Sequence, residues 1–276
     1  MSLIITSLNS GSNGNCYYIG NDDEAVLIDA GLSCRELEKR MARLELDIKK
    51  VSAVFISHEH SDHIFGVQVL SKKHGIPVYI TPATLKSSGL QLVDDLIRTF
   101  TAHQPVQIGG LKVIGFPKFH DASDPHSFVV TSNNTQVGIF TDLGRCCEQL
   151  VHHFKGCHAA FLESNYDEVM LHTGHYPLYL KNRIRGGHGH LSNTEALDLF
   201  TRHRPAFMTH LILSHLSKEN NRPELVQELF TGHAGTTEII VASRVVETAL
   251  YRIGHADLPA LTHRTAPNAR VQLRLF

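Results

Sequence analysis

The chain has 276 residues, and 42% of them are hydrophobic, which is enough to bury the core of one large domain. Its 26 basic and 27 acidic residues nearly balance, which excludes recruitment of a nucleic acid by an overall positive field. The five cysteines contain no CxxC pair, and no apolar run approaches the length of a membrane span, so we expect a cytoplasmic protein that does not enter a membrane.

The N-terminal part of the chain predicts four short strands and one helix. Apolar segments at residues 3–8, 16–19, 25–29 and 51–57 have the length and composition of strands. Residues 34–46 repeat apolar side chains with helical spacing, and Ser33 with Glu36 gives the pattern of a capping box. This alternation of strands and helix indicates an α/β fold.

A glycine-rich and hydroxyl-rich loop, residues 10–15, connects the first two predicted strands. Its backbone N–H groups and the side chains of Ser10, Asn13 and Asn15 could bind an anionic oxygen of a substrate. An ordinary hairpin turn explains the same residues equally well.

Four potential metal ligands follow the strand at residues 51–57. His58 and His60 are two residues apart, so one cation could bind both imidazoles if the backbone stays extended. Asp62 and His63 fall in the following turn, where they could serve a second cation. Loops after the strands of an α/β sheet commonly bind ligands. The spacing therefore predicts two adjacent metal ions, and the alternative is a polar loop that Asp62 caps.

The rest of the chain repeats the alternation of strands and helices. A helix is expected from Asp62 to Gly75, followed by strands at residues 77–80, 111–116, 128–131, 136–141, 159–163 and 207–214. Further helices are expected at residues 193–202, after Ser192, and at residues 223–230. We predict an α/β sandwich of mixed sheets covered by helices, with residues 1–256 as one domain and residues 257–276 as a C-terminal extension.

Three basic residues, Lys181, Arg183 and Arg185, recur at every second position shortly before His188 and His190. In this arrangement they could bind the phosphate backbone of a nucleic acid. A solvated basic surface fits the same pattern, so this segment alone does not decide the substrate.

The sequence HEHSDH at residues 58–63 matches the HxHxDH signature of metallo-β-lactamase-fold hydrolases. The other motifs of that superfamily are matched in order by Asp29 in AVLIDAG, His120 in FPKFHDASDP, Asp142 in GIFTDLG and His215 in LILSHLS. His126 is an alternative to His120, because a predicted strand follows it. Each of these residues taken alone would also suit a strand-end cap, a turn or a surface position.

The resemblance implies a four-layer αββα sandwich with two metal ions. It assigns three ligands to each ion and one bridging ligand: His58, His60 and His120 to the first, Asp62, His63 and His215 to the second, and Asp142 between them. Asp29 would orient ligands without contacting the ions. Imidazole and carboxylate donors suit zinc and also manganese, so we expect two divalent ions, Zn or Mn.

A narrower resemblance is found to the bacterial YycJ/WalJ-like metallohydrolases. It extends over about residues 3–242, in the strings SLNSGSNGNCYYI, LESNYD, YPLYLKNRI, GHLSN and HLSKENN. It implies a 5′-to-3′ exonuclease that hydrolyses phosphodiester bonds of double-stranded DNA. It also suggests that His190 in GHLSN approaches the scissile phosphate or the leaving oxygen. Glu163 and Asn165 could likewise line the site, and structural caps remain the alternative for these three residues.

The expected mechanism uses two close cations, which would lower the pKa of a shared water and hold the resulting hydroxide between them for attack on phosphorus. Asp62 and His190 are the expected catalytic residues. Two other functions fit the same ligands: hydrolysis of small esters, thioesters or lactones as in glyoxalase-type enzymes, and a metal-binding regulatory protein without turnover. The near-neutral charge favours a small substrate, whereas the longer family strings favour DNA. The sequence does not define the oligomeric state.

Overall fold

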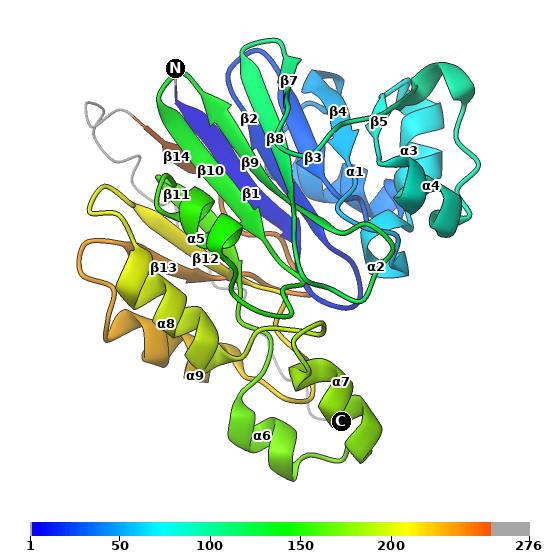
Figure 1. Cartoon of the computed structure of the whole chain (residues 1–276). Helices are drawn as coiled ribbons and strands as arrows, with labels where there is room; N and C mark the ends of the chain where they lie inside the picture. Colours follow the sequence, from blue (N-terminus) through cyan, green and yellow to red (C-terminus); the bar gives the residue numbers. More distant parts are fainter. Residues whose placement is uncertain (1, 255–276) are drawn as a thin grey trace, which may run out of the picture.

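Two seven-stranded sheets form the centre of the computed structural model, which describes residues 2–254 (Figure 1). Their strand orders are β14-β1-β2-β3-β4-β5-β6 and β13-β12-β11-β10-β9-β8-β7. The first sheet contains β1 (Leu3–Asn9), β2 (Cys16–Gly20), β3 (Ala25–Ile28), β4 (Val51–Phe55), β5 (Val78–Tyr79), β6 (Ile97–Arg98) and β14 (Tyr251–Ile253). The second sheet contains β7 (Pro105–Ile108), β8 (Leu111–Pro117), β9 (His126–Ser132), β10 (Thr135–Phe140), β11 (Ala159–Glu163), β12 (His210–Ser214) and β13 (Glu238–Val241).

Helices cover the outer face of each sheet (Figure 1). On the first sheet lie α1 (Cys34–Arg43), α2 (Ser61–Ile64), α3 (Val67–His74) and α4 (Pro82–Ser88). On the second sheet lie α5 (Glu148–Phe154), α8 (Asn193–His203) and α9 (Pro223–Thr231). Two further helices, α6 (Glu168–Thr173) and α7 (Leu178–Arg185), lie together beyond the end of the second sheet.

The burial of alternate strand residues explains this layering. Along a strand, successive side chains point to opposite faces of the sheet. In β11, Phe161 packs in the cluster between the two sheets, whereas Leu162 packs under α5 and α8. In β3, Val26 likewise faces the second sheet and Leu27 faces α1 and α3. Because both faces of both sheets are apolar, the chain forms the expected four-layer αββα sandwich.

Most expected elements are confirmed, with shifted ends, and two expectations were wrong in detail. The helix expected from Asp62 to Gly75 is two helices, α2 and α3, with Phe65 and Gly66 between them. Gly66 lies so close to the backbone of Leu32 that an added Cβ would lie 1.9 Å from the Leu32 carbonyl oxygen. The capping box is only half formed. Ser33 accepts from the N–H of Glu36, but the Glu36 carboxylate accepts from Arg40 instead of returning to the cap.

The last expected strand also begins later than the sequence indicated, at His210, because Phe207 lies in a turn and is half exposed. The extension expected at residues 257–276 lies outside the described residues. Among the helices of residues 2–254, none combines the length and apolarity needed to cross a bilayer.

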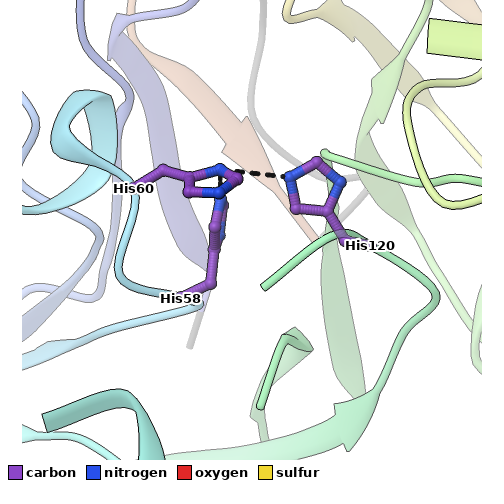
Figure 2. Close-up of side chains that lie close together, drawn as sticks. All are labelled: His58, His60 and His120. Atoms are coloured by element: carbon purple, nitrogen blue, oxygen red, sulfur yellow. Dashed lines mark hydrogen bonds between the residues drawn. The ribbon is translucent and has the colours of Figure 1, made fainter. Parts of the chain in front are cut away.

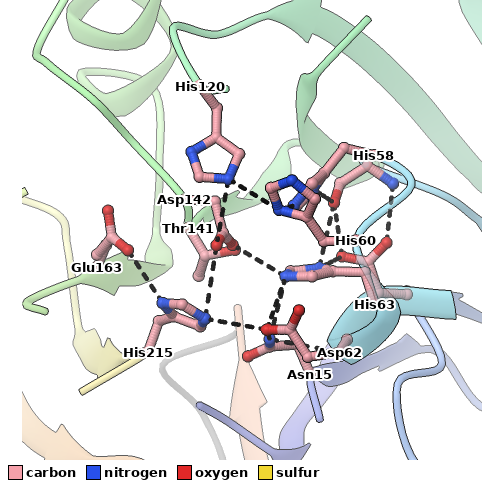
Figure 3. A network of polar contacts seen from close by, with 12 residues as sticks. Asn15, His58, His60, Asp62, His63, His120, Thr141, Asp142, Glu163 and His215 are labelled. Atoms are coloured by element: carbon pink, nitrogen blue, oxygen red, sulfur yellow. Dashed lines mark hydrogen bonds and ion pairs between the residues drawn. The ribbon is translucent and has the colours of Figure 1, made fainter. Parts of the chain in front are cut away.

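The two sheets bring several strand ends to one place. β3 runs parallel to β4, and β10 runs parallel to β11 and β12, so within each sheet these strands finish at a common edge. The loops that follow β3, β4, β8, β10, β11 and β12 meet there (Figure 3). This edge carries the residues from which the sequence predicted a metal site.

Candidate metal centre

Seven side chains that the sequence indicated as metal ligands converge at this edge (Figure 3). They come from the loops after β4, β8, β10 and β12 and from the short helix α2: His58, His60, Asp62, His63, His120, Asp142 and His215. All but His60 and Asp62 are buried. The fold thus brings together possible metal donors from segments that lie far apart in the chain.

Three histidines form the first group (Figure 2). The Nε2 atom of His58 lies 3.1 Å from Nδ1 of His60, and Nε2 of His120 lies 3.3 Å from the same nitrogen. The three ring nitrogens lie within 4.8 Å of one another, so a single ion could contact all of them.

The second group contains two histidines and a carboxylate. Oδ2 of Asp62 lies 3.5 Å from Nε2 of His215 and 3.6 Å from Nε2 of His63. Asp142 lies between the two groups: its Oδ2 is 3.3 Å from Nε2 of His63, and its Oδ1 is 3.5 Å from Nε2 of His215 and 3.9 Å from Nε2 of His120. Among the described residues, Asp142 is therefore the carboxylate that can reach both groups.

Hydrogen bonds to Nδ1 fix which nitrogen of each buried histidine faces the centre. Nδ1 of His120 donates to the carbonyl of Gly189 at 2.9 Å, and Nδ1 of His63 donates to Oδ2 of Asp29 at 2.7 Å. Carbonyl and carboxylate oxygens can only accept, so these Nδ1 atoms carry the hydrogen. Nε2 of His120 and Nε2 of His63 therefore face the centre, and Nε2 of His63 also lies 3.1 Å from Nδ2 of Asn15. Histidine ligands of metal sites are commonly oriented by a hydrogen bond at the other ring nitrogen in this way.

The same logic holds for His58 and His215. The hydroxyl of Ser57 donates to Asp29 at 2.8 Å and accepts from Nδ1 of His58 at 2.9 Å. Nδ1 of His215 lies 3.1 Å from Oε1 of Glu163. His60 is the exception, because its Nδ1 faces the group.

The charges of the centre favour cations. Burial alone lowers the pKa of His63, but the carboxylates of Asp142, Asp29 and Asp62 outweigh it and raise the pKa to about 10. Burial raises the pKa of Asp142, but His215 and His63 hold it well below its usual range. The negative field that would keep an extra proton on His63 equally favours a divalent cation in its place.

Two buried atoms of the centre lack a hydrogen-bond partner among residues 2–254. They are Oδ2 of Asp142 and Nε2 of His215. Such orphaned atoms are costly unless something binds them. Both point into the space between the groups, so the donor set fits bound metal ions.

The backbone is strained at three of these positions. Asp29, Asp142 and His215 have φ of 61°, 55° and 56°, in the left-handed region that non-glycine residues avoid. Each costs about 1–2 kcal/mol. Strain of this kind is typical of functional sites, where it holds a side chain in a direction that relaxed backbone would not give.

Glu163 orients two histidines at once. Its Oε1 accepts from Nδ1 of His190 at 2.9 Å and from Nδ1 of His215 at 3.1 Å, and its Oε2 accepts from the N–H groups of Leu143 and Leu191 at 2.7 and 3.0 Å. Burial raises its pKa, but the neighbouring His190 and His215 lower it to about 2. With both oxygens bonded, Glu163 positions His190 and His215 and leaves no oxygen free for an ion.

A cavity of about 300 Å³ opens over the centre. One wall consists of ligands such as His60, Asp62 and His120, and His190 and Asn165 also line it. α7 and the turn before it contribute four further lining residues: Tyr176, Leu180, Arg183 and Ile184. The candidate ligands and α7 therefore line the same cavity.

The loop at residues 10–15 forms hydrogen bonds with residues of the centre. Ser10 and Asn15 are fully buried: Oγ of Ser10 accepts from the N–H of His215 at 2.7 Å, and Nδ2 of Asn15 donates to Asp62 at 3.1 Å. Asn13 donates to the carbonyl of Arg244 at 2.8 Å. Ser12, which the sequence did not indicate, lies on the cavity wall.

The three basic residues of α7 do not share one face. Because residues 178–185 are helical, positions two apart point in different directions. Arg183 lines the cavity over the centre, whereas Lys181 and Arg185 line a separate cavity with Tyr166. Among the described residues, His126 belongs to none of the groups of possible ligands, and its ring packs against Phe100.

The sequence contained a signal for the α7 wall that was not used. Leu180 and Ile184 are spaced by four residues, which aligns them on one side of α7, and Tyr176 precedes that helix. A stripe of this kind normally packs into a core. Only the structure shows that it faces the cavity.

Comparisons with known proteins agree with this geometry. A family model described as the metallo-beta-lactamase superfamily matches residues 10–175. The chain is 35% identical to exodeoxyribonuclease YycJ of Bacillus anthracis, over 82% of this chain and 87% of that protein. It is 32% identical to exodeoxyribonuclease WalJ of Streptococcus pneumoniae, over 79% of this chain and 83% of that protein. In fold it is similar to the metallo-β-lactamase fold protein YhfI from Bacillus subtilis, with a TM-score of 0.71 and 16% identity over 91% of this chain and 99% of that chain.

Proposed function

The chain belongs to the metallo-β-lactamase superfamily of hydrolases, and from this premise we propose that it is a two-metal exonuclease acting on double-stranded DNA in the 5′-to-3′ direction. The observation that carries the proposal is similarity over about four-fifths of the chain to two relatives named exodeoxyribonucleases. The activity would belong to the reducing cytoplasm, where the five unpaired cysteines stay as thiols.

In this proposal the two groups of donors hold one divalent ion each, Zn or Mn, with Asp142 as the shared ligand. The free Nε2 atoms and the orphaned oxygen of Asp142 support the assignment. Asp29 acts through His63, whose Nδ1–H it accepts. When bound, the two cations would activate a water and neutralise charge that develops on the phosphate oxygens.

The protein's own groups would handle the leaving oxygen and the substrate's position. Nε2 of His190 is free and faces the cavity, so it could donate a proton to the leaving oxygen. Glu163 accepts from Nδ1 of the same ring at 2.9 Å and so fixes its orientation. Arg183 and Asn165, on the cavity wall, are suited to contact a phosphate oxygen.

One observation favours a second candidate. The cavity is small, about 300 Å³, and a small ester, thioester or lactone would also fit it. The same centre could hydrolyse such a carbonyl compound. A binding protein without turnover has no comparable support, since it would not need His190 free at the cavity.

The test compares substrates on the metal-loaded protein. Duplex DNA labelled at either the 5′ or the 3′ end is incubated with the wild type, with Asp62→Ala and with the surface control Asp198→Asn, in parallel with thioesters and lactones. Early release of labelled mononucleotide from the 5′ end, lost only in Asp62→Ala, is the expected result. Early release from the 3′ end would contradict the polarity, and hydrolysis of carbonyl substrates with intact DNA would assign the second function.

A further inference from the structure

The α7 wall, which is the part of the cavity lining from α7 and the turn before it, is mainly apolar and aromatic, whereas most of the other lining residues are polar. Tyr176, Leu180 and Ile184 form it, and Arg183 lies beside them. Apolar side chains do not bind a phosphate group. They can bind the base of a nucleotide, because the face of a nucleobase is apolar and stacks on aromatic side chains.

The wall is fixed relative to the catalytic groups. The carbonyl of Ile184 accepts from the N–H of His190 at 2.8 Å, and Arg183 forms an ion pair with Asp121, which follows His120. At Gly189 an added Cβ would lie 2.2 Å from the Ile184 carbonyl oxygen, so only glycine allows this contact. The distance between α7 and the ligands is therefore set by the fold.

The hairpin of α6 and α7 is braced at its other end. Nζ of Lys181 donates to the carbonyl of His172 at 2.7 Å, which joins the two helices. At Gly174, in the turn between them, an added Cβ would lie 2.7 Å from the carbonyl oxygen of Met170. Tyr176 follows this tight turn, is half-buried and lines the cavity.

From this arrangement we propose that Tyr176, supported by Leu180 and Ile184, binds the base of the terminal nucleotide while the phosphodiester on the 3′ side of that nucleotide lies at the metal centre. This inference rests on the proposed nuclease function and names the part of the substrate that the α7 wall recognises. A cavity of about 300 Å³ is at the lower end of small-ligand sites, so the wall receives one base and not a base pair. Stacking reads no sequence, so the wall accepts all four bases.

The experiment combines protein variants with a substrate that lacks the base. The full-length, metal-loaded wild type, Tyr176→Ala, Tyr176→Phe and Tyr179→Ala act on two duplexes, which differ only in that one has an abasic terminal nucleotide. Tyr179 is a matched control, because it is a tyrosine three positions further along the chain, in α7, is 75% exposed and does not line the cavity. kcat and KM for release of the first nucleotide are measured separately, and thermal melting confirms that each variant is folded.

We expect Tyr176→Ala to lower kcat/KM on the normal duplex by about 5- to 150-fold, mainly through KM, whereas Tyr176→Phe and Tyr179→Ala act like wild type. The abasic end should lower the wild-type value by a similar factor and leave Tyr176→Ala with no further loss. An equal loss on both substrates, or none on either, would overturn the inference while leaving the nuclease intact. A wild type that releases no nucleotide would overturn the proposed function and this inference together.

Discussion

Single hydrogen bonds decide what each histidine of the centre can do. Glu163 and Asp29 each take an Nδ1–H, which leaves Nε2 free toward the cavity or the metal groups. A carboxylate that fixes a ring in this way sets both the direction and the protonation of the opposite nitrogen. Two carboxylates without a direct part in the chemistry thus define the reactive atoms.

His190→Ala should slow turnover without emptying the centre. We expect kcat on duplex DNA to fall by about 100- to 10,000-fold, the usual contribution of a general acid, with metal content unchanged. The loss should shrink on a phosphodiester with a p-nitrophenolate leaving group, which needs no proton. His188→Ala is the control, because His188 is exposed and packs on Phe119. An equal loss on both kinds of leaving group would count against a proton donor.

Asp29→Asn should weaken metal binding. The amide nitrogen that replaces Oδ2 cannot accept the hydrogen bonds from Nδ1–H of His63 and the hydroxyl of Ser57. The ring of His63 therefore loses its orientation. Metal affinity, measured by competition with a chelator, should fall by about 10- to 100-fold. Unchanged affinity for both ions would show that Asp29 only stabilises the fold.

The candidate metal ligands could be identified from sequence because four of them lie close together in the chain. His58, His60, Asp62 and His63 lie in six residues, and no tertiary information is needed to recognise them. Glu163 was a weaker prediction, and its two histidine contacts join residues 27 and 52 positions away. Such partners depend on how strands pair, which local spacing does not encode.

At the scale of elements, close backbone packing sets the position of α2. An added Cβ at Gly31 would lie 1.7 Å from the carbonyl oxygen of Asp62, and the N–H of Gly66 donates to the carbonyl of Ala30 at 2.8 Å. The loop after β3 therefore lies directly beneath the helix that carries two ligands. Glycine at residue 31 is required by this contact and not by its own conformation.

Gly31→Ala should disrupt the centre without touching a ligand. We expect it to destabilise the protein by about 3 kcal/mol or more, the upper range for overpacking, and to abolish binding of the ion held by Asp62. Denaturant unfolding and metal content give the two readouts. Gly232→Ala is the control, since its added Cβ meets nothing closer than 3.9 Å and should cost nothing. A Gly31→Ala protein with full metal content would contradict this packing argument.

Helix α7 shows where local patterns mislead at this scale. Basic residues at every second position suggested one phosphate-binding face, but the helix separates Arg183 from Lys181 and Arg185. The i, i+4 spacing of the apolar residues in the same string was the correct periodicity. The layers of the fold could be predicted from the sequence, because the apolar strands are distinct. Which side of α7 lines the cavity could not be predicted, because this helix lies beyond the end of the sheet.

At the scale of the whole molecule, the centre joins the two halves of the chain. Asp62 and His63 follow the first sheet, and Asp142 and His215 follow the second. Ionised Asp62 and Asp142 repel each other across this junction when no cation separates them. Bound ions should therefore stabilise the contact between the sheets.

Metal removal should lower the melting temperature. At a free ion concentration of about 100 times Kd, each occupied site adds about 2.7 kcal/mol, which corresponds to roughly 5–10 °C. Scanning calorimetry of the chelated and reloaded wild type should show this shift, and Asp142→Asn should show less of it. If the chelated and the reloaded wild type had the same melting temperature, the ions would not bind across the junction.

The most direct test of the two-metal account is a titration of the metal-free protein with Mn²⁺ or Zn²⁺, in which bound ions and the rate of nucleotide release from duplex DNA are measured on the same samples. Activity should rise until two ions are bound per chain and then level off. Full activity with one bound ion, or activity that is unchanged in the metal-free protein, would contradict it.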